Sequence, residues 1–308
     1  MQKILLFQLI LCQLLYASTK TASDKFIYST NDESRILYVY DAKNQISTRL
    51  YEAPSGFRID SYGQSPAGKQ IALLETNGEH MRKGDLGYAI KNLVIINQNG
   101  KVLKRIKNVL EYSWSPAGNS IAFIRGLDYG GMELKPEGIW LLSLSNLNTE
   151  DKLSDVKASD IQWARHNNKI YVKWKEVYEL DPREKTSTKT DFQGIFFSED
   201  GKYYFRPNYE GTGFKLFDTG SNKEIALKSI DNKKVNFYRW IKDSHLIVGD
   251  ITFEKRVLSA KRGDSLSSFS GKVIGFNPKT SEIYVHKDKK AFRGLAKSSI
   301  ERMKLELN

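Results

Sequence analysis

One short motif recurs along this chain at intervals that indicate a repeat architecture. The segment from Trp114 to Phe123 reads Trp-Ser-Pro-Ala-Gly-Asn-Ser-Ile-Ala-Phe and has a near copy from Gln64 to Leu73. Weaker copies begin at Trp163, Phe197 and Trp240, and again at position 276. The six starting points are spaced on average about 42 residues apart, which is room for about four short strands in each unit.

Three columns of large or apolar residues accompany these starting points. One column lies two positions before each start, and two adjacent columns lie in the strand that follows the turn. The columns contain Tyr62, Tyr112, Ile161, Ile195, Tyr238 and Ile274; then Ile71, Ile121, Ile170, Tyr204, Leu246 and Ile283; then Ala72, Ala122, Tyr171, Phe205, Ile247 and Tyr284. Adjacent apolar positions in one strand predict burial on both faces. The Pro-Ala-Gly and Glu-Asp-Gly elements predict tight turns, because proline fixes φ and glycine supplies a positive φ.

The repeat predicts an all-β chain that forms a single β-propeller of four-stranded blades. We prefer seven blades, with six as the alternative; an open β-sandwich or two small β domains fit six aligned repeats less well. Residues 26–28, 36–40 and 46–51 predict three strands before the first motif. The segment from Ile300 to Leu307 is expected to complete their blade and so to tie the two ends of the ring together.

The N-terminus has the three-part pattern of a secretory signal peptide. A short basic start at Lys3 precedes a largely apolar run over residues 4–16, and Ala17 offers a small residue for cleavage. We therefore expect a signal peptide over residues 1–17, with cleavage as late as 22, and a propeller domain over 23–308. The run is too short to span a bilayer, so no transmembrane segment is expected in the mature chain. Because the single cysteine, Cys12, lies in the signal peptide, no disulfide is expected in the mature protein.

The motif from Trp114 to Phe123 resembles the Trp-Ser-Pro-Asp-Gly-Lys repeat of TolB-type β-propellers, which is a WD40-like repeat. The resemblance covers roughly residues 56–290. Ala67 and Ala117 stand where the repeat usually has aspartate, whereas Asp200 keeps it. The resemblance implies a periplasmic or secreted protein that binds partners of the cell envelope. TolB itself has an α/β domain before its propeller, and here the propeller pattern begins almost directly after the signal peptide, so only an exported propeller with this repeat carries over.

The sequence contains few signs of catalysis. It has no Gly-x-Ser-x-Gly elbow, and its histidines are scattered without the spacing of metal ligands. We therefore expect a non-catalytic protein with no cofactor and no metal. The alternative is a metal-dependent propeller hydrolase or lactonase, in which carboxylates would hold an ion at the mouth of the tunnel. Glu111, Asp160 and Arg239 are the candidate tunnel-lining residues, and their mixed charges favour a salt-bridged lining.

Two long insertions separate the second and third strands of consecutive repeats, at residues 76–88 and 125–137. Equivalent loops of adjacent blades emerge on the same face, and long loops on a rigid scaffold are frequent binding sites. We predict that this face binds another protein through His80, Met81, Arg82, Lys83, Asp85, Tyr88, Asp128, Tyr129, Met132 and Glu133. Because the net charge is +12, a glycan or another polyanion is the alternative ligand. No nucleic acid is expected as a partner, and the protein is expected to be a monomer.

Overall fold

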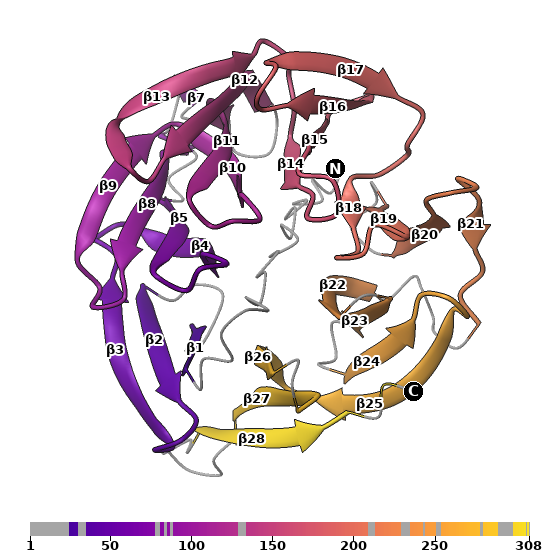
Figure 1. Cartoon of the computed structure of the whole chain (residues 1–308). Coiled ribbons are helices and arrows are strands. Elements are labelled where there is room, and N and C mark those ends of the chain that lie inside the picture. Colours follow the sequence, from indigo (N-terminus) through magenta and orange to yellow (C-terminus); the bar gives the residue numbers. More distant parts are fainter. Residues whose placement is uncertain are drawn as a thin grey trace, which may run out of the picture.

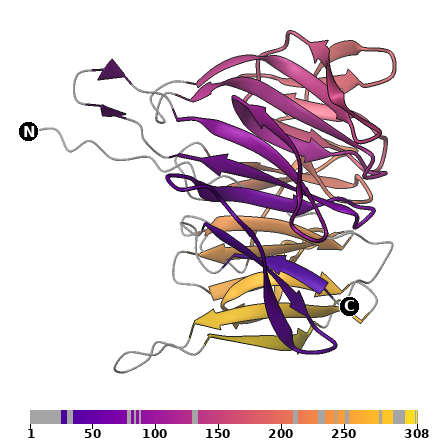
Figure 2. The ribbon, with the colours of Figure 1, turned by 90° about the vertical axis from the view of Figure 1, so that its left-hand side faces the viewer.

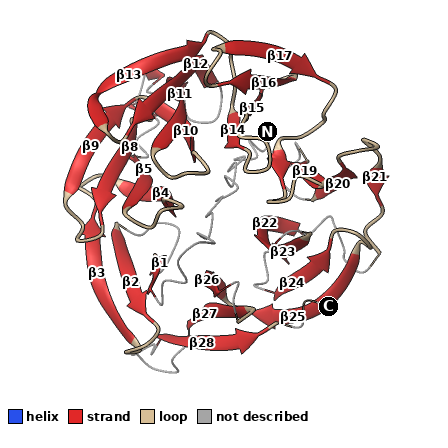
Figure 3. Cartoon of the chain, viewed as in Figure 1, coloured by secondary structure: helices blue, strands red, loops and turns tan. Residues whose placement is uncertain are grey.

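The chain forms a ring of β-sheets around a central axis (Figure 1). The structure is a computed structural model that describes residues 25–29, 35–77, 81–82, 85–86, 89–128, 134–208, 213–228, 235–242, 244–250, 254–277, 280–288, 298–305 and 307. Figure 3 shows strands and loops throughout this part of the chain, which contains no helix. The all-β prediction is therefore confirmed, whereas the predicted signal peptide at 1–17 lies outside the described residues. No helix that could cross a membrane occurs in these ranges.

The ring consists of seven sheets, which we number as blades 1 to 7 in chain order. The innermost strand of each blade comes first in the chain and the outer strands follow in order. Blades 1 to 3 contain β1 (Lys25–Tyr28), β2 (Ile36–Asp41) and β3 (Ile46–Glu52); β4 (Arg58–Gln64), β5 (Gln70–Thr76), β8 (Lys91–Asn97) and β9 (Val102–Lys107); and β10 (Val109–Trp114), β11 (Ser120–Asp128), β12 (Leu134–Ser143) and β13 (Asn146–Ser154). A separate hairpin, β6 (Met81–Arg82) with β7 (Asp85–Leu86), lies within the first insertion.

The remaining blades repeat this arrangement. Blades 4 and 5 contain β14 (Asp160–Trp163), β15 (Ile170–Lys173), β16 (Val177–Asp181) and β17 (Thr186–Thr190); and β18 (Phe196–Phe197), β19 (Tyr203–Pro207), β20 (Phe214–Asp218) and β21 (Glu224–Ile225). Blades 6 and 7 contain β22 (Val235–Lys242), β23 (His245–Asp250), β24 (Glu254–Ser259) and β25 (Asp264–Ser270); and β26 (Lys272–Asn277), β27 (Glu282–Asp288) and β28 (Ser298–Lys304). The preferred number of seven blades is thus confirmed, and the alternative of six is wrong.

The ends of the ring meet differently from the sequence-based expectation. The C-terminal strand β28 pairs with β27 of its own blade, so among the described residues it does not complete blade 1. Blades 1 and 7 meet instead through side chains. The ring of Phe26 lies 4.3 Å from that of Tyr284, and Tyr28, Tyr40 and Ile274 are buried beside them. Aromatic packing rather than a shared sheet therefore joins the two ends.

The strand register follows the repeat. In blades 2 to 7 the starting residue of each motif pairs with the first apolar column of the next strand: Gln64 with Ile71, Trp114 with Ile121, Trp163 with Ile170, Phe197 with Tyr204, Trp240 with Leu246 and Phe276 with Ile283. Both apolar columns of this second strand are buried in all six blades, as predicted. The cores between the blades are built from these columns.

The serine of the motif organises the turn between the first two strands. Ser65, Ser115 and Ser198 are all buried, and each accepts a backbone hydrogen bond with its hydroxyl oxygen and another, from the turn glycine, with its carbonyl oxygen. The turn glycines Gly68, Gly118 and Gly201 have φ of 72°, 70° and 71°. This geometry confirms the predicted glycine turns and explains the serine in the motif.

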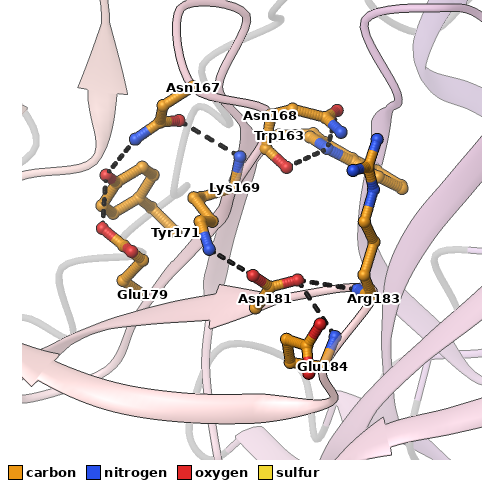
Figure 4. Close-up of polar contacts among 9 residues, drawn as sticks. All are labelled: Trp163, Asn167, Asn168, Lys169, Tyr171, Glu179, Asp181, Arg183 and Glu184. Atoms are coloured by element: carbon orange, nitrogen blue, oxygen red, sulfur yellow. Dashed lines mark hydrogen bonds and ion pairs between the residues drawn. The ribbon is translucent and has the colours of Figure 1, made fainter.

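In blade 4 the corresponding turn lacks the serine and is held by other side chains (Figure 4). The indole N–H of Trp163 donates to the backbone and side-chain oxygens of Asn168, at 3.2 and 3.0 Å. Asn167 donates to the Tyr171 hydroxyl at 2.8 Å, and that hydroxyl donates to Glu179 at 2.7 Å. These contacts all lie within one blade, which indicates a structural rather than a ligand-binding network.

Candidate binding face of blades 2 to 4

The two predicted insertions emerge side by side on one face of the ring. Ala89, at the end of the first insertion, forms a β-bridge with Asp128, at the tip of β11, and its N–H donates to the Asp128 carbonyl at 2.7 Å. Strands β11 and β12 are long, with 9 and 10 residues, and extend towards this face. Figure 2 shows the β6–β7 hairpin standing away from the body of the ring. The bases of the insertions therefore form one continuous platform.

A lysine ties this platform to the inner strand of blade 2. The Lys91 amine, on β8, lies 3.1 Å from the Asp128 carboxylate and 3.7 Å from that of Asp60 on β4. The three side chains are only 11 to 21% exposed. Burial acts to lower the pKa of Lys91, but the two carboxylates outweigh it, and the net pKa is raised. Lys91 therefore stays charged and links blades 2 and 3.

A carboxyl group on the next inner strand titrates far from its usual range. Glu111 lies on β10, and burial raises its pKa to about 8; a hydrogen bond from the Tyr112 N–H, 3.0 Å long, and the charge of Lys91 oppose the shift. Asp160 and Asp60 add to it by repulsion. At neutral pH, Glu111 is therefore mostly protonated and can donate a hydrogen bond.

Asp160 and Lys173 extend this group of charges into blade 4. Burial raises the pKa of Asp160, while the Ser159 hydroxyl, which donates to it at 2.9 Å, and Lys173 lower it. The Lys173 amine donates to the Gln193 carbonyl at 2.9 Å, and burial lowers its pKa to about 8. Three adjacent blades thus place carboxyl groups and two buried amines along one side of the ring.

The structure separates the three predicted tunnel-lining residues. Glu111 and Asp160 lie on adjacent blades and interact electrostatically, whereas Arg239 lies on β22 of blade 6. In the described part of the chain, Arg239 pairs with neither carboxyl group. The tunnel-lining assignment stays a prediction. Among the described residues, the acidic groups lie on blades 2 to 4, and Lys91 and Lys173 are the cations that interact with them.

The predicted contact residues are described only in part. Met81, Arg82 and Asp85 lie in the β6–β7 hairpin. Asp128 is 8% exposed and holds Lys91, so its carboxylate belongs to the base of the face. The other predicted residues, His80, Lys83, Tyr88, Tyr129, Met132 and Glu133, lie outside the described residues.

Sequence reasoning missed Asp60, Lys91 and Lys173. Lys173 aligns with positions 74 and 124 of the neighbouring repeats, and a lysine in that otherwise apolar column was the available signal. Within the described ranges, no group of three His, Cys, Asp or Glu residues is arranged to hold a metal ion.

Comparisons with known proteins support the fold. No protein family and no curated protein matches the sequence. A chain in the crystal structure of the mitotic checkpoint complex is 11% identical, with a TM-score of 0.59 over 89% of this chain and 83% of that chain. An oligogalacturonate lyase of Vibrio parahaemolyticus is 9% identical, with a TM-score of 0.51 over 73% of this chain and 71% of that chain. Likeness at these identities shows the fold alone, so the chain is a seven-bladed β-propeller and the TolB-type resemblance stays a prediction from its residues.

Proposed function

We propose that this chain is an exported, non-catalytic β-propeller that binds another protein of the bacterial periplasm or cell envelope. The observation that carries the proposal is the joined base of the two insertions, where Ala89 pairs with Asp128 and Lys91 holds two carboxylates. A rigid base under two long connections is what a protein-binding loop surface requires. The signal-peptide pattern of residues 1–17 supports export.

The test of binding compares the whole chain with a variant whose insertions are shortened. Residues 78–88 and 129–133 would each be replaced by an Asn-Gly turn, which leaves β11, β12 and the Ala89–Asp128 bridge in place. Proteins cross-linked to each form in the native host would be quantified by mass spectrometry. We expect a defined partner to be recovered with the wild type and to be lost from the shortened variant.

The matched control changes the opposite face. The β16–β17 turn follows a third strand, so it lies at the other end of its blade from the β11–β12 connection, and Arg183 and Glu184 in it are exposed. Arg183→Ala/Glu184→Ala should leave recovery of the partner unchanged. Equal recovery from the wild type and the shortened variant would rule out the insertions as the binding site.

Three further measurements separate the alternatives. A polyanionic or glycan ligand, consistent with the net charge of +12, predicts binding that falls steeply with added salt, because exposed charges are screened. Fusion of residues 1–24 to a reporter enzyme that is active only outside the cytoplasm tests export. An inactive fusion would contradict the proposed location, and a stoichiometric divalent ion in the purified protein would favour the enzyme alternative.

A further inference from the structure

One position of the inner strand makes contacts from blade to blade. This position directly precedes the motif start. The Gly63 carbonyl accepts from the Trp114 indole at 3.1 Å, and the Phe196 carbonyl accepts from the Trp240 indole at 2.9 Å. Ser113 accepts from the Trp163 N–H at 2.8 Å, and Gln162 accepts from the Phe197 N–H at 2.7 Å. In each of blades 2 to 5, the residue at this position therefore accepts a hydrogen bond from the following blade.

Arg239 occupies the same position in blade 6 and departs from the pattern. It is 4% exposed, and its Nε atom is fully buried with no hydrogen-bond partner. In the described ranges, no carboxylate comes within ion-pair distance of it. A guanidinium nitrogen that is buried without a partner is destabilising, because its desolvation is not compensated.

The described electrostatic neighbour of Arg239 comes from a distant blade. Tyr62, on β4 of blade 2, opposes the lowering of the Arg239 pKa to about 10 by burial. Blades 7 and 1 lie between blades 6 and 2, and Figure 1 shows β22 and β4 facing each other across the middle of the ring. The Arg239 guanidinium therefore extends towards the centre of the ring. The Tyr62 hydroxyl oxygen already accepts from the Ser29 N–H at 3.2 Å.

A second buried basic side chain lies in the same blade as Arg239. Lys255, in the same blade as Arg239, is 8% exposed and lies over Gly249. The carboxyl groups at the centre, Asp60, Glu111 and Asp160, lie on blades 2 to 4. These carboxyl groups therefore lie on other blades than Arg239, and a buried lysine lies in its own blade.

We propose that Arg239 anchors an oxyanion site at the centre of the ring, for a small ligand that bears a carboxylate, phosphate or sulfate group. The planar guanidinium presents paired N–H donors that match two oxygens of such a group. A bound anion compensates the buried charge, with which no carboxylate of the described residues forms an ion pair. The site is separate from the insertion platform and goes beyond the proposed protein-binding function.

The test uses the whole chain with sodium phosphate, sulfate and acetate, against sodium chloride at the same ionic strength. Thermal unfolding and calorimetric titration measure stabilisation and affinity. We expect at least one oxyanion to raise the Tm of the wild type and to saturate at one ligand per chain. Arg239→Met should bind that anion at least about tenfold more weakly, because a charge-assisted bidentate contact is lost. The preferred anion identifies the ligand group.

A second readout does not require the ligand to be known. In chloride alone, Arg239→Met should raise the Tm, because it removes an uncompensated buried charge while keeping much of the side-chain volume. If the Arg239→Met variant does not fold, Arg239→Gln replaces it. Arg183→Met, at an exposed turn, is the control that should leave anion binding unchanged. Absence of saturable binding by all three anions, or equal binding by the wild type and the Arg239 variants, would overturn the proposal.

Discussion

The indole N–H of Trp114 donates to the carbonyl oxygen of Gly63 at 3.1 Å and so joins the inner strand of blade 3 to that of blade 2. Trp240 makes the same contact with Phe196 between blades 6 and 5, at 2.9 Å. Tyrosines of the neighbouring column add to it, since the Tyr112 hydroxyl donates to Ala72 at 2.8 Å. In blades 3 and 6 the tryptophan of the motif therefore connects two blades by a hydrogen bond as well as filling the core.

Trp114→Phe should lower the free energy of unfolding by about 1 to 2 kcal/mol, because it leaves the Gly63 carbonyl without this donor while keeping an aromatic ring in the core. Chemical denaturation of the purified protein measures the change. Trp140→Phe is the control, since the Trp140 indole donates no hydrogen bond in the described part of the chain. A loss of the same size in both variants would mean that ring volume, and not the joint, sets the cost.

A turn glycine can be required for its positive φ or for the space that a Cβ would fill. A pair of substitutions separates these two requirements. Gly201 has a φ of 71°, and a Cβ there would overlap the imidazole ring of His166 from the preceding blade. Gly56 has a φ of 82°, and a Cβ added there would have no neighbour within 4 Å. Gly56→Ala should therefore cost only the backbone strain, about 1 kcal/mol, and Gly201→Ala clearly more. Equal urea midpoints for the two variants would show that the His166 side chain moves aside without a loss of stability.

The repeat columns made most of the ring predictable. A tight turn fixes the register of the strands that flank it, so the spacing from Trp114 to Ile121 predicts their pairing directly. The closure of the ring was not predictable in the same way. Blade 1 carries no copy of the motif, and its contact with blade 7 depends on aromatic side chains such as Phe26 and Tyr284, whose pairing has no signal in the sequence.

The candidate site was predictable where it depends on topology and not where it depends on electrostatics. The described ends of the insertions at 76–88 and 125–137 lie side by side because the insertions are equivalent connections of neighbouring blades. The charges beneath them are set by strands from three blades. Lys91 comes close to Asp60 and Asp128 only in the folded ring. Arg239 lies across the ring from the carboxyl groups with which the sequence predicts a salt bridge.

The raised pKa of Glu111 makes stability depend on pH. Its folded-state pKa of about 8 exceeds the usual 4.5, so between these values the folded chain binds the proton more strongly than the unfolded chain. This contribution is fully present below pH 4.5 and is lost as the pH rises through 8. Relative to pH 5, Glu111→Gln should gain about 4 kcal/mol of stability over the wild type near pH 8.5.

Unfolding midpoints at a series of pH values provide this measurement. Glu184→Gln, at an exposed turn of blade 4, should track the wild type at every pH. A Glu111→Gln curve that runs parallel to the wild-type curve would show that Glu111 is charged throughout this range.

The Lys91 contacts predict a large loss when the amine is removed. Lys91→Met removes a cation that lies beside the carboxylates of Asp60 and Asp128, which should cost about 3 kcal/mol of unfolding free energy. Lys91→Met/Asp128→Asn should recover part of this loss, because it removes one of the two negative charges beside the missing amine. The matched control is Lys189→Met, whose 2.5 Å pair with Glu176 joins side chains that are 58 and 47% exposed; it should cost less than about 1 kcal/mol. Denaturation midpoints distinguish the outcomes. If both lysine variants lost the same small amount, the carboxylates would have to be solvated in the folded ring, and the platform under the two insertions would not depend on Lys91.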